Sequence, residues 1–81
     1  MTYIMNMVMK WTRQRDDLGN VWYEGRVAGA LEARVWHDPA SRMNYKWICR
    51  IRNHAPFSKR SAILCKKDAD AIVSTFYNPL L

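Results

Sequence analysis

The chain has 81 residues, of which 49% are hydrophobic, and a formal net charge of +6. This length predicts one domain, residues 1–81, with a modest core, and the apolar fraction excludes a disordered chain. The sequence contains no run of about 20 apolar residues of the kind that predicts a membrane span. Its apolar N-terminus is not preceded by the basic residues of a secretory signal, so we expect a cytoplasmic protein.

The N-terminal part predicts a strand at residues 3–11, because every second side chain there is large and apolar. The side chains on that face are Tyr3, Met5, Met7, Met9 and Trp11. A methionine row of this kind is able to pair edge to edge with a second copy, so the sequence leaves a homodimer open. The polar residues 13–20 end in Leu-Gly-Asn, which predicts a turn.

Alternating patterns continue through the middle of the chain. They predict three strands, at residues 21–27, 31–37 and 44–52. A tight reversal at residues 28–30 separates the first two strands, and Asp38-Pro39 opens a turn before the third, because proline presets the backbone angle of the second turn position.

The C-terminal part predicts a loop at residues 53–60, a short strand at residues 61–66 and then a helix. Asp68 is a suitable N-cap, and Asn78-Pro79 is expected to end the helix. The buried stripe of this helix is expected at Ala69, Ile72, Val73 and Phe76. The predicted fold class is therefore α+β, an antiparallel β-meander of about five strands with one C-terminal helix packed on one face.

Alternation along the middle strands separates two faces of the predicted sheet. One face is apolar and is expected to form the core: Val21, Tyr23, Val27, Leu31, Ala33, Val35, Tyr45, Trp47, Cys49 and Ile51. The other interleaves aromatic, aliphatic and charged residues: Trp22, Glu24, Arg26, Glu32, Arg34, Trp36, Lys46, Ile48, Arg50 and Arg52. Cations neutralise phosphates and indoles stack on bases, so this face suits nucleic acid. Solvated sheet faces with satisfied cross-strand pairs have the same composition, so both interpretations stay open.

The positive charge is concentrated in one part of the chain. Residues 39–67 contain eight Lys or Arg and no Asp or Glu. Such a block attracts polyanions or acidic protein surfaces. The loop aromatic Phe57 lies beside Lys59 and Arg60, where it either contacts a partner or packs beneath its own loop. The candidate binding residues are Trp22, Arg26, Arg34, Trp36, Lys46, Arg50, Arg52, Phe57, Lys59 and Arg60.

The sequence predicts neither an enzyme nor a cofactor. His37 and His54 are the residue type of a ribonuclease acid–base pair, but nothing in their spacing brings them together. Together with Cys49 and Cys65, these histidines lack the closely spaced ligand pairs of a zinc site, so no metal is expected. Two cysteines are too few for a disulfide framework, and we expect two buried thiols.

In size and general architecture, the chain resembles the small single-domain proteins of phages and mobile elements, anti-CRISPR proteins among them. The resemblance carries no motif and no residue, and it implies an inhibitor that occupies a docking surface of a larger complex. Our hypothesis is a non-enzymatic binding module for a polyanionic partner, either nucleic acid or nucleoprotein. The alternatives are an inhibitor or adaptor that binds an acidic protein face, and a small ribonuclease.

Overall fold

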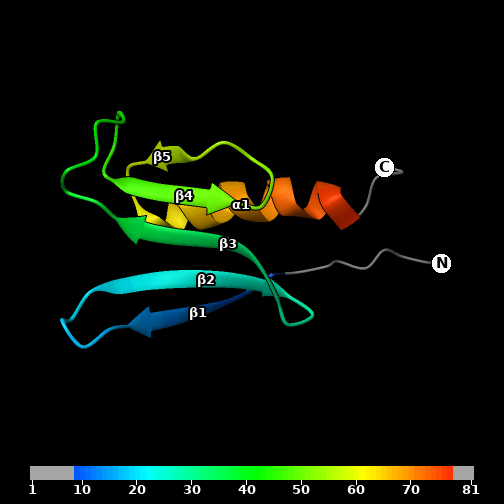
Figure 1. The fold of residues 1–81 in the computed structure, drawn as a ribbon. Coiled ribbons are helices and arrows are strands. Elements are labelled where there is room, and N and C mark those ends of the chain that lie inside the picture. The colour runs from blue at the N-terminus through cyan, green and yellow to red at the C-terminus, as the bar shows by residue number, and fades with distance from the viewer. Residues whose placement is uncertain (1–8, 78–81) are drawn as a thin grey trace.

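The computed structural model describes residues 9–77, which form one sheet and one helix (Figure 1). The elements are β1 (Lys10–Arg15), β2 (Val21–Val27), β3 (Ala30–His37), β4 (Trp47–Ile51), β5 (Phe57–Lys59) and α1 (Ala62–Tyr77). Each strand pairs antiparallel with the next, in the order β1-β2-β3-β4-β5. The predicted α+β meander with a C-terminal helix is confirmed. Within residues 9–77, no helix is long and apolar enough to cross a membrane.

The first strand lies further along the chain than its alternating pattern indicated. β1 pairs along its whole length with residues 21–26 of β2, so that Lys10 lies opposite Arg26 and Arg15 lies opposite Val21. Residues 3–8 of the predicted strand lie outside the described residues, and with them most of the methionine row. Met9 is buried in the core.

The helix begins earlier than predicted, because Ser61 caps it. The Ser61 Oγ accepts a hydrogen bond from the Leu64 backbone N–H at 3.2 Å, which satisfies one of the unpaired donors of the first turn. Residues 62–66 are therefore helical, the predicted strand at residues 61–66 is wrong, and Asp68 lies inside α1. The fifth strand is instead β5, which falls within the predicted loop at residues 53–60.

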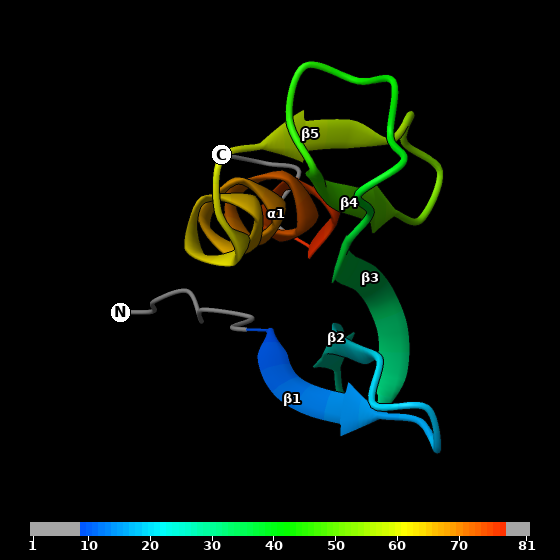
Figure 2. The same cartoon turned by 90° about the vertical axis from the view of Figure 1, so that its left-hand side faces the viewer.

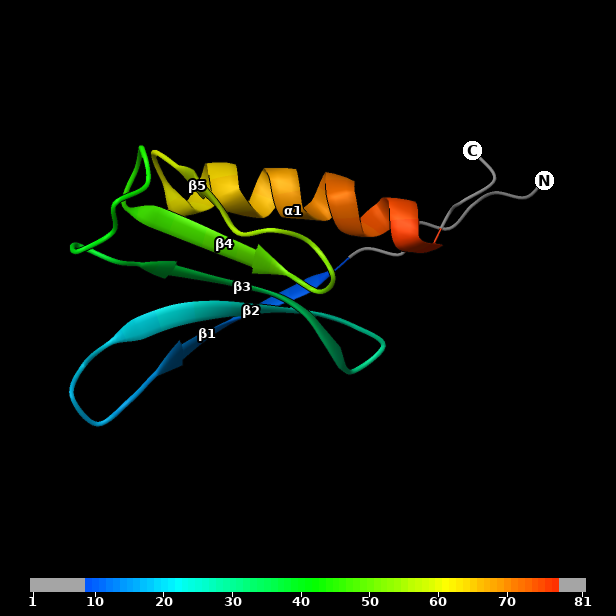
Figure 3. The same cartoon turned by 45° about the horizontal axis from the view of Figure 1, so that its top comes forward.

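The sheet curves around α1, which lies on its concave side along β3, β4 and β5 (Figures 2 and 3). The buried core between them consists of Met9, Val27, Ala33, Val35, Cys49, Ile51, Cys65, Ala69 and Val73. Both cysteines are free and buried, as expected. Burial raises the pKa of the Cys49 thiol to about 12, so this thiol behaves as a small apolar side chain.

A bulge at the start of β3 interrupts the alternation. Gly25 lies opposite Ala33, but the next residue, Arg26, lies opposite Leu31, so Glu32 is the extra residue of β3. Leu31 therefore shares a face with Arg26 and is 40% exposed, whereas Glu32 is buried at 3% exposure. The predicted places of Leu31 in the core and of Glu32 on the opposite face are both wrong.

Candidate nucleic-acid interface

Two rows of side chains cross the sheet on the side away from α1. The strand register places Gln14, Trp22, Trp36, Ile48 and Ser58 in one row. The neighbouring row contains Thr12, Glu24, Arg34 and Arg50. We refer to Trp22, Glu24, Arg26, Arg34, Trp36 and Arg50 as the outer face. Five predicted binding residues are thus brought together: Trp22, Arg26, Arg34, Trp36 and Arg50.

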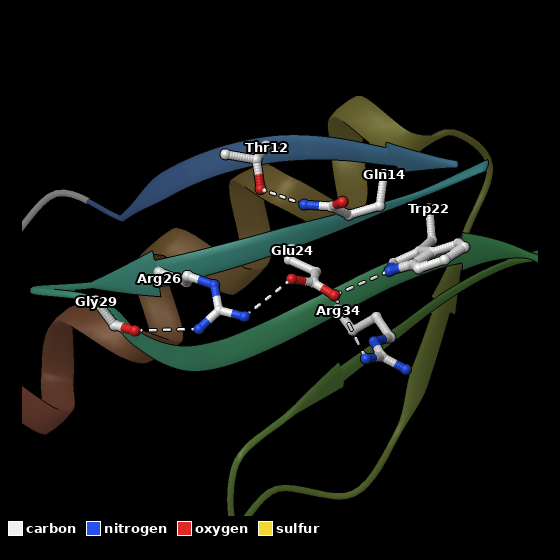
Figure 4. Close-up of polar contacts among 7 residues, drawn as sticks. All are labelled: Thr12, Gln14, Trp22, Glu24, Arg26, Gly29 and Arg34. Atoms are coloured by element: carbon white, nitrogen blue, oxygen red, sulfur yellow. Dashed lines mark hydrogen bonds and ion pairs between the residues drawn. The ribbon is translucent and has the colours of Figure 1, made fainter. Parts of the chain in front are cut away.

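Glu24 organises the outer face (Figure 4). Its Oε1 lies 3.0 Å from the Arg26 Nη2, and its Oε2 accepts a hydrogen bond from the Trp22 Nε1 at 3.0 Å. The Arg34 Nη2 lies 3.5 Å from the same Oε2. The Trp22 hydrogen bond is the largest cause of the lowered pKa of Glu24, followed by Arg26. Glu24 was not among the predicted site residues, although its position opposite Arg34 follows from pairing two alternating strands.

The indole of Trp22 is held in place as a flat surface. Its N–H is bonded to Glu24, and the guanidinium carbon of Arg34 lies 5.9 Å from the ring centroid. Trp36 lies directly opposite Trp22 on β3, and both side chains are partly exposed. Ile48 continues this row on β4 but is only 4% exposed. The accessible apolar part of the row is therefore the two indoles.

Arg34 and Arg50 lie directly opposite each other on β3 and β4. Like charges in this position destabilise a sheet. Glu24 neutralises part of the Arg34 charge, whereas Arg50 is exposed and forms no ion pair with any residue of the described range 9–77. An anion bound between the two guanidinium groups would remove the repulsion.

Two hollows flank the centre of the outer face, one toward each end of β3. The first has a volume of about 860 Å³ and is lined by Asp16, Gly19, Asn20, Val21, Trp22, Arg34, Trp36, His37, Pro39 and Trp47. The second, of about 640 Å³, is lined by Leu31, Glu32, Ala33, Arg34, Trp36, Arg50, Ile51, Arg52, Asn53 and His54. Arg34 and Trp36 line both hollows, so the surface between the hollows is continuous.

Arg52 does not continue the outer face as predicted. Its Nε donates to the Glu32 Oε1 at 2.8 Å, and its guanidinium lies 5.5 Å from the ring centroid of Phe76 on α1. The Tyr77 hydroxyl donates to the same carboxylate. The bulge causes this difference, because it buries Glu32 on the helix side, where the carboxylate needs a counter-charge. Arg52 still lines the second hollow, but with its charge paired.

The predicted strand at residues 44–52 is shorter in the structure, since β4 begins at Trp47. Lys46 lies in the preceding loop, where its Nζ donates to the Ser41 carbonyl oxygen at 2.7 Å. Tyr45, expected in the core, is 39% exposed. The Arg60 guanidinium lies 5.8 Å from the Tyr45 ring centroid. Both cations are therefore engaged by residues of the β3–β4 loop, to which Lys46 itself belongs.

Phe57 and Lys59 belong to β5, and their side chains lie on the face of the sheet that packs toward α1. Phe57 lies opposite Cys49 and packs against the core. The Lys59 Nζ pairs with the Asp68 Oδ2 at 2.7 Å. Neither side chain belongs to the outer face, because residues 57 and 59 share the strand face that packs toward the helix.

The two histidines lie in different hollows. The His37 ring packs edge-on against Trp47, with 5.1 Å between centroids, and His54 packs similarly against Phe57. His54 follows Ile51, which lies opposite Ala33 on β3. His37 is four residues further along β3 than Ala33, and four residues of strand span about 13 Å. This separation does not support a pair acting on one phosphate. Among residues 9–77, no three His, Cys, Asp or Glu side chains form a group that could hold a metal ion.

No protein-family model, curated protein or solved structure matches this chain.

Proposed function

We propose that this protein is a non-enzymatic binding module that holds the sugar–phosphate backbone of nucleic acid against its outer face. The observation that carries the proposal is the cross-strand pair of Arg34 and Arg50, which lies beside a fixed indole and is only partly neutralised. Sheets avoid like charges at this spacing, whereas a phosphate favours them. The two free, buried thiols are compatible with action in the reducing cytoplasm.

The outer face offers separate contacts for the two parts of a nucleotide. Arg34 and Arg50 provide cations for phosphates and release counterions on binding. Trp22 and Trp36, in the adjacent row, provide flat surfaces on which bases stack. Arg26 is held by Glu24 and by the Gly29 carbonyl oxygen, to which its Nη1 donates at 3.1 Å. Arg26 therefore adds positive potential at a fixed position.

The test is a titration of labelled single-stranded and duplex DNA and RNA at several salt concentrations. Binding should weaken steeply with salt, by about 0.7 in log–log slope per phosphate neutralised on single strands and about 0.9 on duplex DNA. Failure to bind any of these nucleic acids at about 50 mM salt, where charge attraction is strong, would contradict the proposal. That result would favour the alternative partner, an acidic face of a protein.

A further inference from the structure

The first hollow combines flat indole surfaces with one carboxylate and one guanidinium. Its volume of about 860 Å³ lies within the usual range for small-ligand pockets. The lining includes Trp22 and Trp36, with Asp16 and Asn20 of the β1–β2 turn at its edge. Arg34 also lines it and connects it with Arg50 on the outer face. A ligand that fits both the indole surfaces of the hollow and the arginine pair carries a flat ring on one part and a negative charge on another.

Two parts of the lining of this hollow, the β1–β2 turn and the Trp22 ring, are held in place before any ligand binds. The Asp16 Oδ1 accepts hydrogen bonds from the backbone N–H groups of Leu18 and Asn20, each at 2.9 Å, and its Oδ2 accepts from the Asn20 Nδ2 at 2.9 Å. These bonds lower the pKa of Asp16, chiefly through Asn20. On the other side, Glu24 and Arg34 hold the Trp22 ring. Fixed walls reduce the entropy lost on binding.

The charges within the hollow select which part of a nucleotide enters. The ionised carboxylate of Asp16 repels a phosphate from its part of the lining, whereas Arg34 in the lining and Arg50 beyond it attract one. Because the Asn20 Nδ2 is engaged by Asp16, the amide oxygen of Asn20 is left to accept a hydrogen bond from a base. The indoles favour a ring face. A base is therefore favoured inside the hollow, with its phosphates on Arg34 and Arg50.

We infer that the first hollow accepts one unpaired nucleobase, and that the protein consequently prefers single-stranded to double-stranded nucleic acid. This inference rests on the proposed function. A base within a duplex has both faces covered by its neighbours and must be unstacked before it can enter, which costs free energy that a single strand does not need.

The test compares three labelled oligonucleotides of about 12 nucleotides, a length within the usual site size of a single-strand binder. They are a single strand, the same strand annealed to its complement, and a strand of abasic spacers with the same phosphates. Fluorescence anisotropy at about 50 mM salt should show the single strand binding about 5- to 150-fold more tightly than the abasic strand, the range expected for stacking of one base. The duplex should also bind more weakly than the single strand.

Variants of Trp36 locate the effect. Trp36→Ala should lose most of the preference for the base-bearing strand, and Trp36→Phe should keep most of it because the ring is retained. Trp11→Phe is the matched control, since Trp11 lies on the helix side, where its Nε1 donates to the Asp70 Oδ1 at 3.0 Å. This control should leave the preference unchanged.

The outcomes separate the inference from the proposed function. If the abasic strand or the duplex binds as tightly as the single strand, the inference is overturned and the phosphate-binding function stands. If none of the three oligonucleotides binds, both are overturned. The abasic comparison uses the unaltered protein, so it decides the question even if Trp36→Ala fails to fold.

Discussion

At the scale of single residues, the positive block of the sequence is partly neutralised by acids from outside it. Arg52 pairs with Glu32, and Lys59 pairs with Asp68. Arg50 lies in the same block but forms no ion pair within residues 9–77, and it points to the face where binding is proposed. The distribution of ion pairs, more than the net charge, therefore distinguishes structural cations from cations available to a partner.

The buried carboxylate of Glu32 makes a pH-dependent contribution to stability. Its pKa is lowered, with the Arg52 hydrogen bond as the largest cause, so the contribution is complete above the ordinary value of 4.5 and is lost as the pH falls through the lower folded-state value. Glu32→Gln should reduce the free energy of unfolding at pH 7 by about 1.5–3 kcal/mol, typical of a hydrogen bond to a charged group.

Urea denaturation between about pH 7 and pH 3 measures this difference. The stability of the wild type should converge on that of Glu32→Gln as the pH falls, because protonation removes the same ion pair. Asp17→Asn, which changes an exposed acid of the β1–β2 turn, is the control and should behave like the wild type. Curves for the wild type and Glu32→Gln that stay parallel over the whole range would contradict the assignment.

At the scale of elements, the β2–β3 hairpin shapes one end of the outer face. Its turn residues Ala28 and Gly29 have φ angles of 50° and 86°, the signature of a type I′ turn, which matches the twist of the paired strands. The Gly29 carbonyl oxygen accepts a hydrogen bond from Arg26. The hairpin therefore helps to position a cation of the outer face. Its Ala28 adopts a left-handed conformation that is unfavourable for alanine.

Ala28→Asn should stabilise the protein by about 1 kcal/mol, because asparagine tolerates the left-handed region and Asn-Gly is the preferred type I′ pair. Chemical denaturation provides the measurement. Gly29→Ala should have the opposite effect, since it adds a Cβ at a φ of 86°. A lower stability for Ala28→Asn would show that this turn is not under the backbone strain inferred from its angles.

The extent to which the sequence predicted this structure depends on how local each feature is. Alternation placed Trp22, Arg34, Trp36 and Arg50 on one face because period two holds along regularly paired strands. It failed at Glu32, since the bulge depends on how β3 pairs with β2, which no single strand reveals. It also failed at residues 61–66, where a short apolar run is ambiguous between strand and helix.

The sequence also contains a signal for the true start of the helix, which competes with the strand-like apolar run at residues 61–66. Cys65, Ala69 and Val73 are spaced by four residues and are all buried, and Ser61 precedes them as a cap. The ion pairs of Arg52 and Lys59 were less accessible to sequence reasoning. Their partners, Glu32 and Asp68, meet them only after the bulge and the helix are placed.

At the scale of the whole molecule, the curvature of the sheet places the core and the proposed binding face on opposite sides. The concave side is filled by α1, so the core lies there and the opposite side stays accessible (Figure 2). β1 begins and α1 ends at one end of the molecule (Figure 3). The first hollow lies at the other end, beside the β1–β2 turn. Binding at the outer face thus requires no rearrangement of the core.

The central claim, that Arg34 and Arg50 form an anion site, is tested most directly by comparing Arg50→Glu with Lys67→Glu. Both variants change the net charge equally, but Lys67 is an exposed residue of α1. We predict that Arg50→Glu weakens single-strand binding by roughly tenfold or more at about 50 mM salt and reduces the salt slope by about 0.7. Lys67→Glu should weaken binding by no more than about threefold, because its charge is distant from the site.

The same two proteins are then compared by thermal denaturation. Arg50→Glu should be as stable as the wild type or more stable by about 0.2–1 kcal/mol, because it places a carboxylate opposite Arg34. Weaker binding without loss of stability is the result expected of a binding residue. Equal loss of affinity in both variants, or unfolding of Arg50→Glu, would contradict the account.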